Sequence, residues 1–403
     1  MATDFQPGEP RYKVALFNSS DVRGKKVGGI QTYMRDYIQY HPADMDLLVI
    51  GGDETGQLPL GEVTEVEFRG RKFKFLPLFH LDDINPNYAA GISGSDTFRF
   101  AKLMIKHWGK LRRILREGGY TAEVRRVEYA PILWSMGVKV ITMVHIWGRK
   151  DQPMSSTLGK HWYIRDATEF TAAALSEKMY GVSTPMTEMF RQKYKPFARK
   201  FDTLTTWANP EIFKPSPYSF DDGLIHVIYA GRMDKFKRPD LMFRTMAALN
   251  RLHPGGARFH YVGNGDVESF PEFEAARDIT VRHGILTSEQ IGALMNSMHL
   301  GILTSDFEGM PCIVMETLSA GRPVVARHLP QLEDVIHDGS SGWLVPTDKD
   351  VEVQAQRMIE VYEAMRAGSV TPDGVAKAVE PFSLTELLGK IWKDHRVLHG
   401  LKA

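Results

Sequence analysis

The 403-residue sequence is poor in cysteine, has no long apolar run and carries no excess of either charge. Its one cysteine, Cys312, excludes an internal disulfide framework and favours a reducing compartment. No run of about 18 apolar residues occurs, which predicts that no helix crosses a membrane. The 50 lysines and arginines balance 49 acidic residues, so the overall charge does not indicate a nucleic-acid partner. Because residues 1–10 lack the apolar core of a signal peptide, we expect a cytoplasmic protein.

The rest of the composition is that of a globular protein with enough residues for two cores. Hydrophobic residues make up 43% and charged residues 25% of the chain, a balance typical of soluble domains. In the first half, apolar runs that read as strands alternate with a predicted helix over residues 30–40. The expected strands cover residues 12–17, 47–50, 138–144 and 172–175. This alternation predicts an α/β fold with a doubly wound parallel sheet.

A change of composition divides the chain near its middle. Residues 208–223 hold several prolines and few aliphatic residues, which is typical of a linker. A second alternating series follows, with expected strands over residues 225–230, 259–262, 281–284, 300–303 and 323–326. We therefore predict a first domain over residues 1–207 and a second domain over residues 224–381. The remaining segment, residues 382–403, contains a predicted helix over 384–398.

Two glutamates eight residues apart, Glu308 and Glu316, frame the most informative stretch. It lies between two expected strands, so the pattern predicts strand, turn, helix and strand. Glu308 then lies in the loop at the carboxyl end of a strand, and Glu316 lies about two turns into the helix. Because eight residues is close to two turns of 3.6, both carboxylates point toward one crevice. Such a crevice is the usual ligand site of open α/β sheets.

Several motifs between residues 225 and 346 occur in an order that resembles the retaining GT-B glycosyltransferases of family 4, the glycosyl transferases group 1. They are Gly231-Arg232 followed by Lys237, Gly263-Asn264-Gly265, Val281 to Leu286, and Glu308 to Glu316. The resemblance over the first half of the chain is weaker but collinear. It implies a GT-B fold, in which two Rossmann-like domains face a cleft and the last helix crosses back to the first domain.

The resemblance also implies roles for the acidic and basic residues of the second domain. Glu308 would contact the donor sugar and Glu316 the ribose of the nucleotide. Arg232 and Lys237 would hold the diphosphate, and fixed cations aimed at a developing anion can do this without a metal. Because the neighbouring Lys235 adds another cation, the sequence leaves open which lysine contacts phosphate. A further departure is an arginine at position 238, where the family usually has glycine.

Other positions match the places where the family holds its donor. A histidine at a strand's carboxyl end, His145, would lie close to the donor sugar. Glycines after the first strand would let the backbone approach a phosphate at a helix N-terminus. The expected donor contacts are Gly28, Gly29, Gly231, Gly284, Gly309, Met310, Pro311 and Cys312. Pro311 has no N–H to donate, and Cys312, with no base placed to activate it, reads as a small buried residue and not a nucleophile.

The sequence predicts that the site needs no metal. It also predicts no cofactor, because a nucleotide-sugar would be a substrate. Asp-x-Asp matches, the signature of metal-dependent GT-A enzymes, occur at Asp44-Met45-Asp46 and Asp348-Lys349-Asp350. The first precedes a buried strand and the second lies in a polar loop. We therefore interpret both as solvated edges of the fold.

A basic amphipathic helix is predicted over residues 98–117. Its cations form one stripe, Arg99, Lys102, Lys106, Lys110 and Arg113, and its apolar residues form another, Phe100, Met104, Trp108, Leu111 and Leu115. Further cations occur at residues 71–74 and 191–200. Two interpretations stay open, an ordinary surface helix packed on its sheet or a patch that binds anionic lipid and meets a lipid-linked acceptor.

These observations predict a retaining glycosyltransferase that moves a sugar from a UDP- or GDP-sugar donor to a hydroxyl acceptor. Assembly of polysaccharide, lipopolysaccharide or glycolipid would be its setting. Two alternatives remain. A nucleotide-sugar epimerase can share the GT-B fold and would isomerise a nucleotide-sugar on its own. A non-catalytic accessory subunit would be expected to lack a motif residue, and this chain retains Arg232, Lys237, Glu308 and Glu316.

Overall fold

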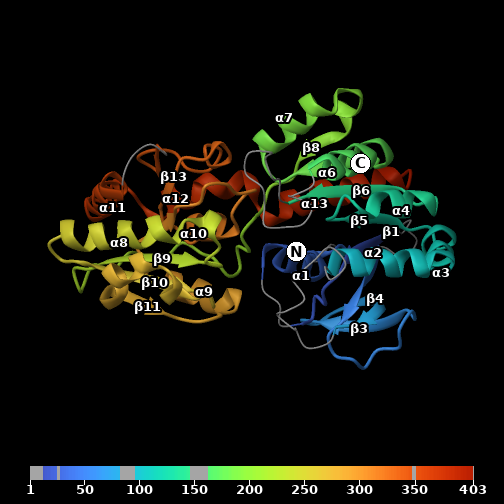
Figure 1. Ribbon diagram of the computed structural model, residues 1–403, viewed down its shortest axis with the longest axis horizontal. Helices are drawn as coiled ribbons and strands as arrows, with labels where there is room; N and C mark the ends of the chain where they lie inside the picture. Colours follow the sequence, from blue (N-terminus) through green and yellow to red (C-terminus); the bar gives the residue numbers. More distant parts are fainter. Residues whose placement is uncertain (1–11, 25–27, 82–95, 146–161, 347–350, 403) are drawn as a thin grey trace. The chain divides into compact units, whose positions relative to one another are not determined.

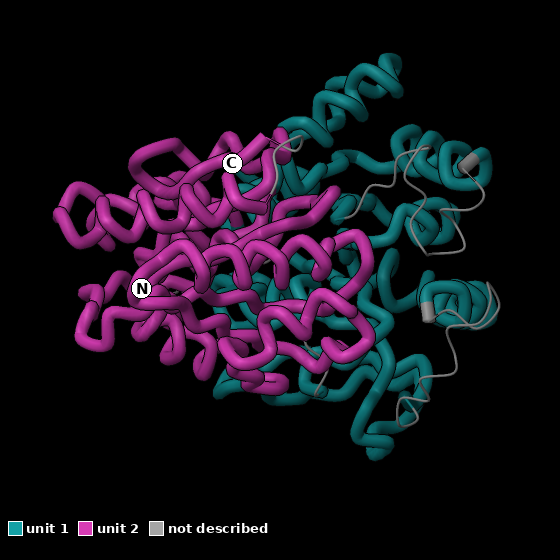
Figure 2. The backbone as a smooth tube through the Cα atoms, turned by 60° about the vertical axis from the view of Figure 1, so that its left-hand side comes forward, with its two compact units in different colours: residues 1–204, 388–403 teal, residues 205–387 magenta. Residues whose placement is uncertain are grey.

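The protein folds as two compact units. The computed structural model describes residues 12–24, 28–81, 96–145, 162–346 and 351–402. Unit 1 comprises residues 1–204 with 388–403, and unit 2 comprises residues 205–387. Figure 2 colours the two units separately. The end of the chain, residues 388–403, belongs to unit 1. Each unit has its own sheet, which is parallel apart from one edge strand of unit 1 (Figure 1), as the alternating pattern of the sequence predicts.

The described part of unit 1 contains a sheet with the order β3-β4-β2-β1-β5-β6-β7-β8. All neighbours in it are parallel except β3 and β4. The central strands are apolar and buried, as expected when helices cover both faces. The strands are β1 Tyr12–Asn18, β2 Met45–Asp53, β3 Thr64–Phe68, β4 Arg71–His80, β5 Thr121–Val124, β6 Val140–Val144, β7 Lys178–Gly181 and β8 Phe201–Thr203.

Helices flank the strands of unit 1 (Figure 1). They are α1 Gly29–Tyr40, α2 Asp96–Lys106, α3 Trp108–Arg112, α4 Tyr129–Ser135, α6 Trp162–Leu175, α7 Thr184–Lys193 and α13 Leu384–Leu398. The chain passes from β1 to β2 on one side and later places β5 on the other side of β1. The strand order therefore reverses between β1 and β5, the position where open α/β sheets bind ligands.

Unit 2 contains a sheet with the order β11-β10-β9-β12-β13-β14, in which all pairs are parallel. Its strands are β9 Ile225–Ala230, β10 Ala257–Val262, β11 Thr280–Arg282, β12 Leu300–Leu303, β13 Val324–Arg327 and β14 Gly342–Val345. Its helices are α8 Pro239–Leu252, α9 Ser288–Met295, α10 Cys312–Ser319, α11 Val351–Arg366 and α12 Pro372–Ala376. Here the strand order reverses between β9 and β12.

Helix α13, the helix predicted over residues 384–398, packs on unit 1. The Trp392 ring stands perpendicular to the Tyr37 ring with 5.7 Å between centroids. Asp394 accepts hydrogen bonds from Lys178 and Tyr180, and a ring nitrogen of His395 lies 2.8 Å from the Thr121 hydroxyl. These contacts explain why the chain's last residues belong to unit 1. Among the described residues, every helix is too short or too polar to cross a membrane.

One predicted strand is wrong. Residues 172–175 are the last residues of helix α6 Trp162–Leu175, and the strand of this region is β7 Lys178–Gly181. The segment is three alanines and a leucine, the residues with the highest helix propensity, so the preceding helix continues through it. A short apolar run does not by itself distinguish a buried helix end from a strand.

Candidate functional site

The predicted acidic and basic residues of unit 2 meet where its strand order reverses. Arg232 and Lys237 follow β9, whereas Glu308 follows β12, and these strands are neighbours in the sheet. Glu316 lies in helix α10, which begins at Cys312 just after the Glu308 loop. Because the carboxyl ends of parallel strands share one edge, residues from separate segments of the chain gather there.

An ion pair between Lys237 and Glu308 forms the centre of this site. The lysine ammonium contacts Glu308 Oε1, and the two side chains are only 17% and 10% exposed. The Ser305 hydroxyl donates a hydrogen bond of 2.7 Å to the same carboxylate oxygen, and the Gln331 amide donates one of 2.9 Å to the Glu308 carbonyl. A pair with so little solvent around it is screened weakly, so the attraction between the two charges holds both side chains in place.

Backbone contacts hold the loop after β9 against the loop after β12. The Thr304 hydroxyl donates to the Lys237 carbonyl at 2.8 Å, and the Asp306 N–H donates to the Phe236 carbonyl at 2.8 Å. The Phe236 and Phe307 rings stack with 4.7 Å between centroids. These contacts fix the position of Lys237 relative to Glu308. Lys235, at the start of the same turn, is exposed.

The backbone conformation at Arg238 explains why glycine would suit this position. Its backbone is left-handed, with φ of 54° and ψ of 57°, a conformation that glycine adopts without penalty. The arginine side chain compensates, because its Nε and Nη2 bind the two carboxylate oxygens of Asp240 at 2.9 and 2.8 Å. Its Nη1 also lies 3.3 Å from Asp306. The departure from the family pattern is thus accommodated at the N-terminus of α8.

This backbone conformation can be tested with two substitutions of Arg238. Both Arg238→Gly and Arg238→Ala remove the bonds to Asp240 and Asp306, but only glycine relieves the left-handed strain. We expect the glycine variant to be more stable than the alanine variant by about 1 kcal/mol. Urea unfolding midpoints measure the difference. Equal midpoints for the two variants would contradict a strained backbone at this position.

The charged residues of the site surround the Cys312 thiol at the start of α10. Loss of hydration and the nearby Glu316 carboxylate raise the pKa of Cys312 to about 12, and Glu308 acts in the same direction while Lys237 opposes it. The thiol is therefore neutral at physiological pH and is a poor nucleophile. These electrostatic effects also show that Glu316, Glu308 and Lys237 all lie near the first turn of α10.

Arg232 differs from Lys237 in its surroundings. Its side chain is 75% exposed and forms an ion pair of 2.9 Å with Asp234. Its backbone carbonyl accepts a hydrogen bond of 3.1 Å from the Tyr229 hydroxyl. The guanidinium is therefore free to reorient toward a ligand, whereas Lys237 is already fixed.

Tight glycine turns shape the edge of the sheet beside these charges. A Cβ at Gly263 would lie 2.4 Å from the Gly231 carbonyl oxygen, so the turns after β9 and β10 pack backbone against backbone. Gly284 has φ of 68° and accepts a hydrogen bond of 2.8 Å from the Gly263 N–H. Gly309, Met310 and Pro311 lead into α10, with Pro311 at its N-cap.

The predicted site residues of unit 1 lie around helix α1 and strand β6. Gly28 is the N-cap of α1 and Gly29 its first residue. His145 follows β6, and its ring meets the Tyr33 ring edge to face at 6.1 Å. Burial, together with the charges of Arg125 and Arg126, lowers the pKa of His145 to about 3. The imidazole is therefore neutral near pH 7.

Three residues of these sites were not found from the sequence. Ser305 and Gln331, which hold Glu308, carry no motif, although Ser305 comes soon after an apolar strand. Arg125 follows β5, a four-residue strand that contains Glu123 and therefore lacks an apolar run. No sequence pattern pointed to Arg125, because β5 can be recognised as a strand only from its place in the sheet.

The first Asp-x-Asp match has a structural role. Asp44 pairs with Arg396, and Asp46 binds Lys74 at 2.8 Å. Both aspartates flank the first residue of β2, at the amino end of the strand and away from the ligand-binding edge. The second match includes Asp348 and Asp350, which lie outside the described residues. Within the described ranges, no group of three or more metal-ligating side chains could hold a metal ion.

The basic stripe predicted over residues 98–117 lies on α2, α3 and the single π-turn that follows them. Phe100, Met104, Leu111 and Leu115 are buried, so most of the apolar stripe packs inward. Trp108 is 37% exposed, and its indole N–H donates a hydrogen bond of 2.9 Å to the Ser135 hydroxyl. Four of the stripe's cations are exposed: Lys102, Lys106, Lys110 and Arg113.

Known proteins are similar to this chain in part of its sequence or in its fold. Residues 225–364 match the family model described as glycosyl transferases group 1. An alpha-D-kanosaminyltransferase of Streptomyces kanamyceticus is 28% identical over 142 residues, which cover 34% of this chain and 36% of that protein. A D-inositol 3-phosphate glycosyltransferase of Pseudarthrobacter chlorophenolicus is 22% identical over 206 residues, 49% of this chain and 48% of that protein. The chain thus spans less than half the length of these two curated relatives.

Solved structures match almost the whole chain. Sucrose-phosphate synthase from Thermosynechococcus elongatus superposes with a TM-score of 0.74 at 15% identity, over 97% of this chain and 100% of that chain. HepE of Anabaena, in complex with UDP and glucose, superposes with a TM-score of 0.66 at 13% identity, over 97% and 100% of the two chains. The resemblance seen in the sequence is therefore confirmed for the fold and for the group 1 motif region: this chain has the GT-B fold, and residues 225–364 match the family model of the glycosyl transferases group 1.

Proposed function

We propose that the protein is a retaining glycosyltransferase that moves a sugar from a nucleotide diphosphate donor to a hydroxyl group of an acceptor. The observation that carries this proposal is the enclosed Lys237–Glu308 pair where the strand order of the group 1 domain reverses. A fixed ammonium at that edge suits a diphosphate leaving group, because the negative charge on the leaving group grows as the sugar bond breaks.

The geometry favours Lys237 over Lys235 as the phosphate ligand. The Lys237 ammonium has three N–H donors, so it can keep Glu308 as one partner and bind a phosphate oxygen with another. Glu308 would then orient the donor sugar, from which the diphosphate departs. The exposed Arg232 would swing from Asp234 to the diphosphate when the donor binds.

Helix α10 supplies the remaining donor contacts in this proposal. Its N-terminus begins at Cys312, and the positive end of a helix attracts anions. The backbone from Gly309 to Cys312 would face the donor, although Pro311 offers no N–H. Glu316, on the second turn of α10, would bind the ribose hydroxyls, and Gly284 would lie against the base.

The ligands of several solved neighbours support a nucleotide-sugar donor. HepE of Anabaena was solved with UDP and glucose, and an Escherichia coli trehalose-6-phosphate protein with UDP-2-fluoro glucose. These ligands make UDP-sugars the first donors to test, with GDP-sugars next. The proposed acceptor is a hydroxyl group in polysaccharide, lipopolysaccharide or glycolipid assembly.

A binding screen tests the proposed function. The full chain would be titrated by calorimetry with UDP, GDP and their glucose, galactose and mannose conjugates, once with Mg²⁺ and once with excess chelator. We expect one nucleotide series to bind equally in both conditions, because Lys237 and Arg232 replace a metal. Binding that requires the metal would contradict metal independence. If neither nucleotide series binds, the transferase proposal is overturned. Isomerisation of the bound nucleotide-sugar in the absence of an acceptor would also overturn it.

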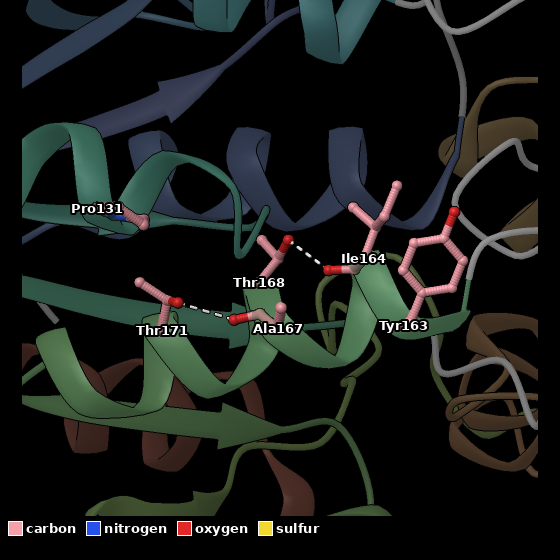
Figure 3. Close-up of a pocket in the computed structure, with 6 residues that line it drawn as sticks. All are labelled: Pro131, Tyr163, Ile164, Ala167, Thr168 and Thr171. Carbon is pink, nitrogen blue, oxygen red and sulfur yellow. Dashed lines mark hydrogen bonds between the residues drawn. The ribbon is translucent and has the colours of Figure 1, made fainter.

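Unit 1 also offers a surface for a lipid-linked acceptor. Next to the exposed cations of α2 and α3, Trp134 on α4 is exposed, and α4 packs against both α2 and α6. A shallow cavity of about 360 Å³ lies between α4 and α6, lined by Pro131, Tyr163, Ile164, Ala167, Thr168 and Thr171 (Figure 3). Its threonine hydroxyls are bonded to helix carbonyls, at 2.8 Å each, so mainly their methyl groups remain to face a ligand.

This arrangement predicts binding to anionic vesicles. Each cation near such a surface contributes about 1 kcal/mol, so the exposed stripe would support weak attachment. The triple variant Lys102→Glu, Lys106→Glu, Lys110→Glu should lose sedimentation with phosphatidylglycerol vesicles at low salt and keep its nucleotide affinity. A control variant with three glutamates at Lys377, Lys393 and Lys402 carries the same charge change elsewhere. If both variants sediment alike, the basic stripe is an ordinary surface.

A further inference from the structure

Three side chains converge where the strand order of unit 1 reverses. Arg125 directly follows β5 Thr121–Val124, and His145 directly follows β6 Val140–Val144. Strands β5 and β6 are paired, with Val124 opposite Thr142, so the residues after them emerge side by side at the carboxyl edge. Tyr33 approaches both from helix α1. This is the edge at which a ligand of unit 1 is expected.

Arg125 is buried there with only part of its hydrogen-bonding capacity used. Its side chain is 3% exposed, and its Nη2 binds Glu123 Oε1. The guanidinium carbon lies 4.0 Å from the centroid of the Tyr33 ring, which fixes the plane of the group. Its Nε and Nη1 are buried and have no hydrogen-bond partner in the structure. Together these two atoms hold three N–H donors.

Such a group is unfavourable unless something binds it. Buried N–H groups of an ionised side chain are nearly always bonded, because leaving them without water or a partner is costly. Glu123 does not remove this requirement, because its Oε1 binds Nη2 and not Nε or Nη1, and Oε1 also accepts a hydrogen bond of 3.1 Å from Tyr33. The Oε2 of Glu123 itself has no hydrogen-bond partner among the described residues and lies 3.5 Å from a ring nitrogen of His395. Arg125 is therefore paired with one oxygen of Glu123, which it shares with Tyr33, and its Nε and Nη1 stay without a partner in the described part of the chain.

His145 provides a second unsatisfied atom at the same edge. Its Nε2 is buried and also has no hydrogen-bond partner in the structure. The charges of Arg125 and of the exposed Arg126 act on its ring, which places both guanidinium groups near the imidazole. The edge thus combines unused donors, positive charge and a neutral imidazole nitrogen. Oxygens of a phosphate or carboxylate group match this set.

We propose that Arg125 and His145 bind an oxyanion carried by the acceptor, a phosphate or a carboxylate, so that this enzyme glycosylates an anionic acceptor. The inference rests on the proposed transferase function and names the chemical class of its second substrate. Arg125 binds the charge, Tyr33 holds the guanidinium plane, and the Nε2 of His145 completes the contacts. Donor binding uses Lys237 and Glu308 in unit 2 and does not depend on Arg125.

Saturation-transfer NMR with matched probes tests the proposal. The full chain would be saturated with the nucleoside diphosphate that it binds best, which occupies the phosphate site of unit 2. The probes are glucose 1-phosphate, glucuronate and glucose, which differ in the anionic group. We expect at least one anionic probe to bind about tenfold or more tightly than glucose, the effect of one charge-assisted hydrogen bond. Phosphate and carboxylate probes distinguish the two oxyanions. Equal binding of all three probes would overturn the proposal.

Variants of Arg125 then locate the site. Arg125→Gln should abolish the preference for the anionic probe, whereas Lys393→Gln, which removes an exposed cation of the same unit outside the basic stripe, should leave it unchanged. Arg125→Lys keeps the charge and should retain part of the preference. If Arg125→Gln destabilises the fold by leaving Glu123 unpaired, the double variant Glu123→Gln, Arg125→Gln removes both charges and serves instead. An anion preference that survives in these variants would place the oxyanion elsewhere and overturn the assignment.

The outcome is separable from that of the proposed function. Nucleoside diphosphate binding measured on the same samples reports on the site of Lys237 and Arg232, in which Arg125 takes no part. A chain that binds nucleotide but shows no anion preference would retain the transferase proposal and lose this one. A chain that binds neither nucleotide series fails the transferase proposal first, and with it the acceptor class that rests on it.

Discussion

Replacing Lys237 by alanine should lower the rate of sugar transfer by about 100- to 1,000-fold, the range for removing one preorganised donor at a developing anion. The ammonium is enclosed and held against Glu308, so it is positioned before the donor binds. Its loss also leaves the Glu308 carboxylate with Ser305 as its remaining hydrogen-bond donor among the contacts described above. The rate of donor hydrolysis, in which water replaces the acceptor, measures this effect without a known acceptor.

Lys235→Ala is the matched control for this prediction. It removes the same charge from the same turn, but Lys235 is exposed, and we expect less than about threefold change in rate. A double variant, Lys237→Ala with Glu308→Gln, separates the two roles of the lysine. If Lys237 acts mainly by holding Glu308, the double variant is no slower than Glu308→Gln alone. Equal rates in Lys235→Ala and Lys237→Ala would remove Lys237 from the diphosphate site.

Acidification should strongly destabilise unit 2, because a row of histidines crosses its sheet. Asp222 lies 2.8 Å from His226, which lies 2.9 Å from His260, which in turn lies 3.0 Å from His283. Each gap joins two ring nitrogens or a ring nitrogen and a carboxylate. A hydrogen bond between two imidazole rings needs one protonated and one unprotonated nitrogen. Protonating the accepting nitrogen of His260 would therefore break one hydrogen bond of the row.

The sign of the pH effect follows from the pKa values. Burial, together with the neighbouring His226, lowers the pKa of His260 to about 3, and burial lowers that of His299 to about 4. An unfolded histidine takes up its proton near pH 6.5. The stabilisation from neutral His260 and His299 is therefore complete above pH 6.5 and is lost as the pH falls toward 3 or 4. At pH 5 each contributes a loss of about 2 kcal/mol, a large share of a typical stability.

Urea unfolding at pH 7.5 and pH 5.0 measures this loss. His260→Gln cannot take up the proton and should reduce the difference in unfolding free energy between the two pH values by about 2 kcal/mol. His328→Gln replaces a more exposed histidine of the same unit and is the control. The same pH dependence in wild type and His260→Gln would show that the row does not govern acid stability.

The sequence by itself predicted five of the six described strands of the second unit and the positions of its two glutamates, but not strand β14 Gly342–Val345. Alternating apolar runs identified strands there because each is a local pattern of a few residues, and all five expected strands of that unit exist. The spacing of Glu308 and Glu316 placed them on a loop and the following helix, as observed. Local patterns failed at residues 172–175, where a short apolar run is the end of a helix and not a strand. They also failed at β5, a buried strand that carries the charged Glu123.

Only the tertiary structure decided which residues act on one another. Lys237 meets Glu308 across 71 residues of chain, Gln331 supports Glu308 across 23, and His226 meets His260 across 34. These partners are set by the order of strands in the sheet, which no local pattern records. The same order brings Arg125 beside His145, although the sequence singled out His145 alone. A buried guanidinium with unused donors becomes visible only when its neighbours in space are known.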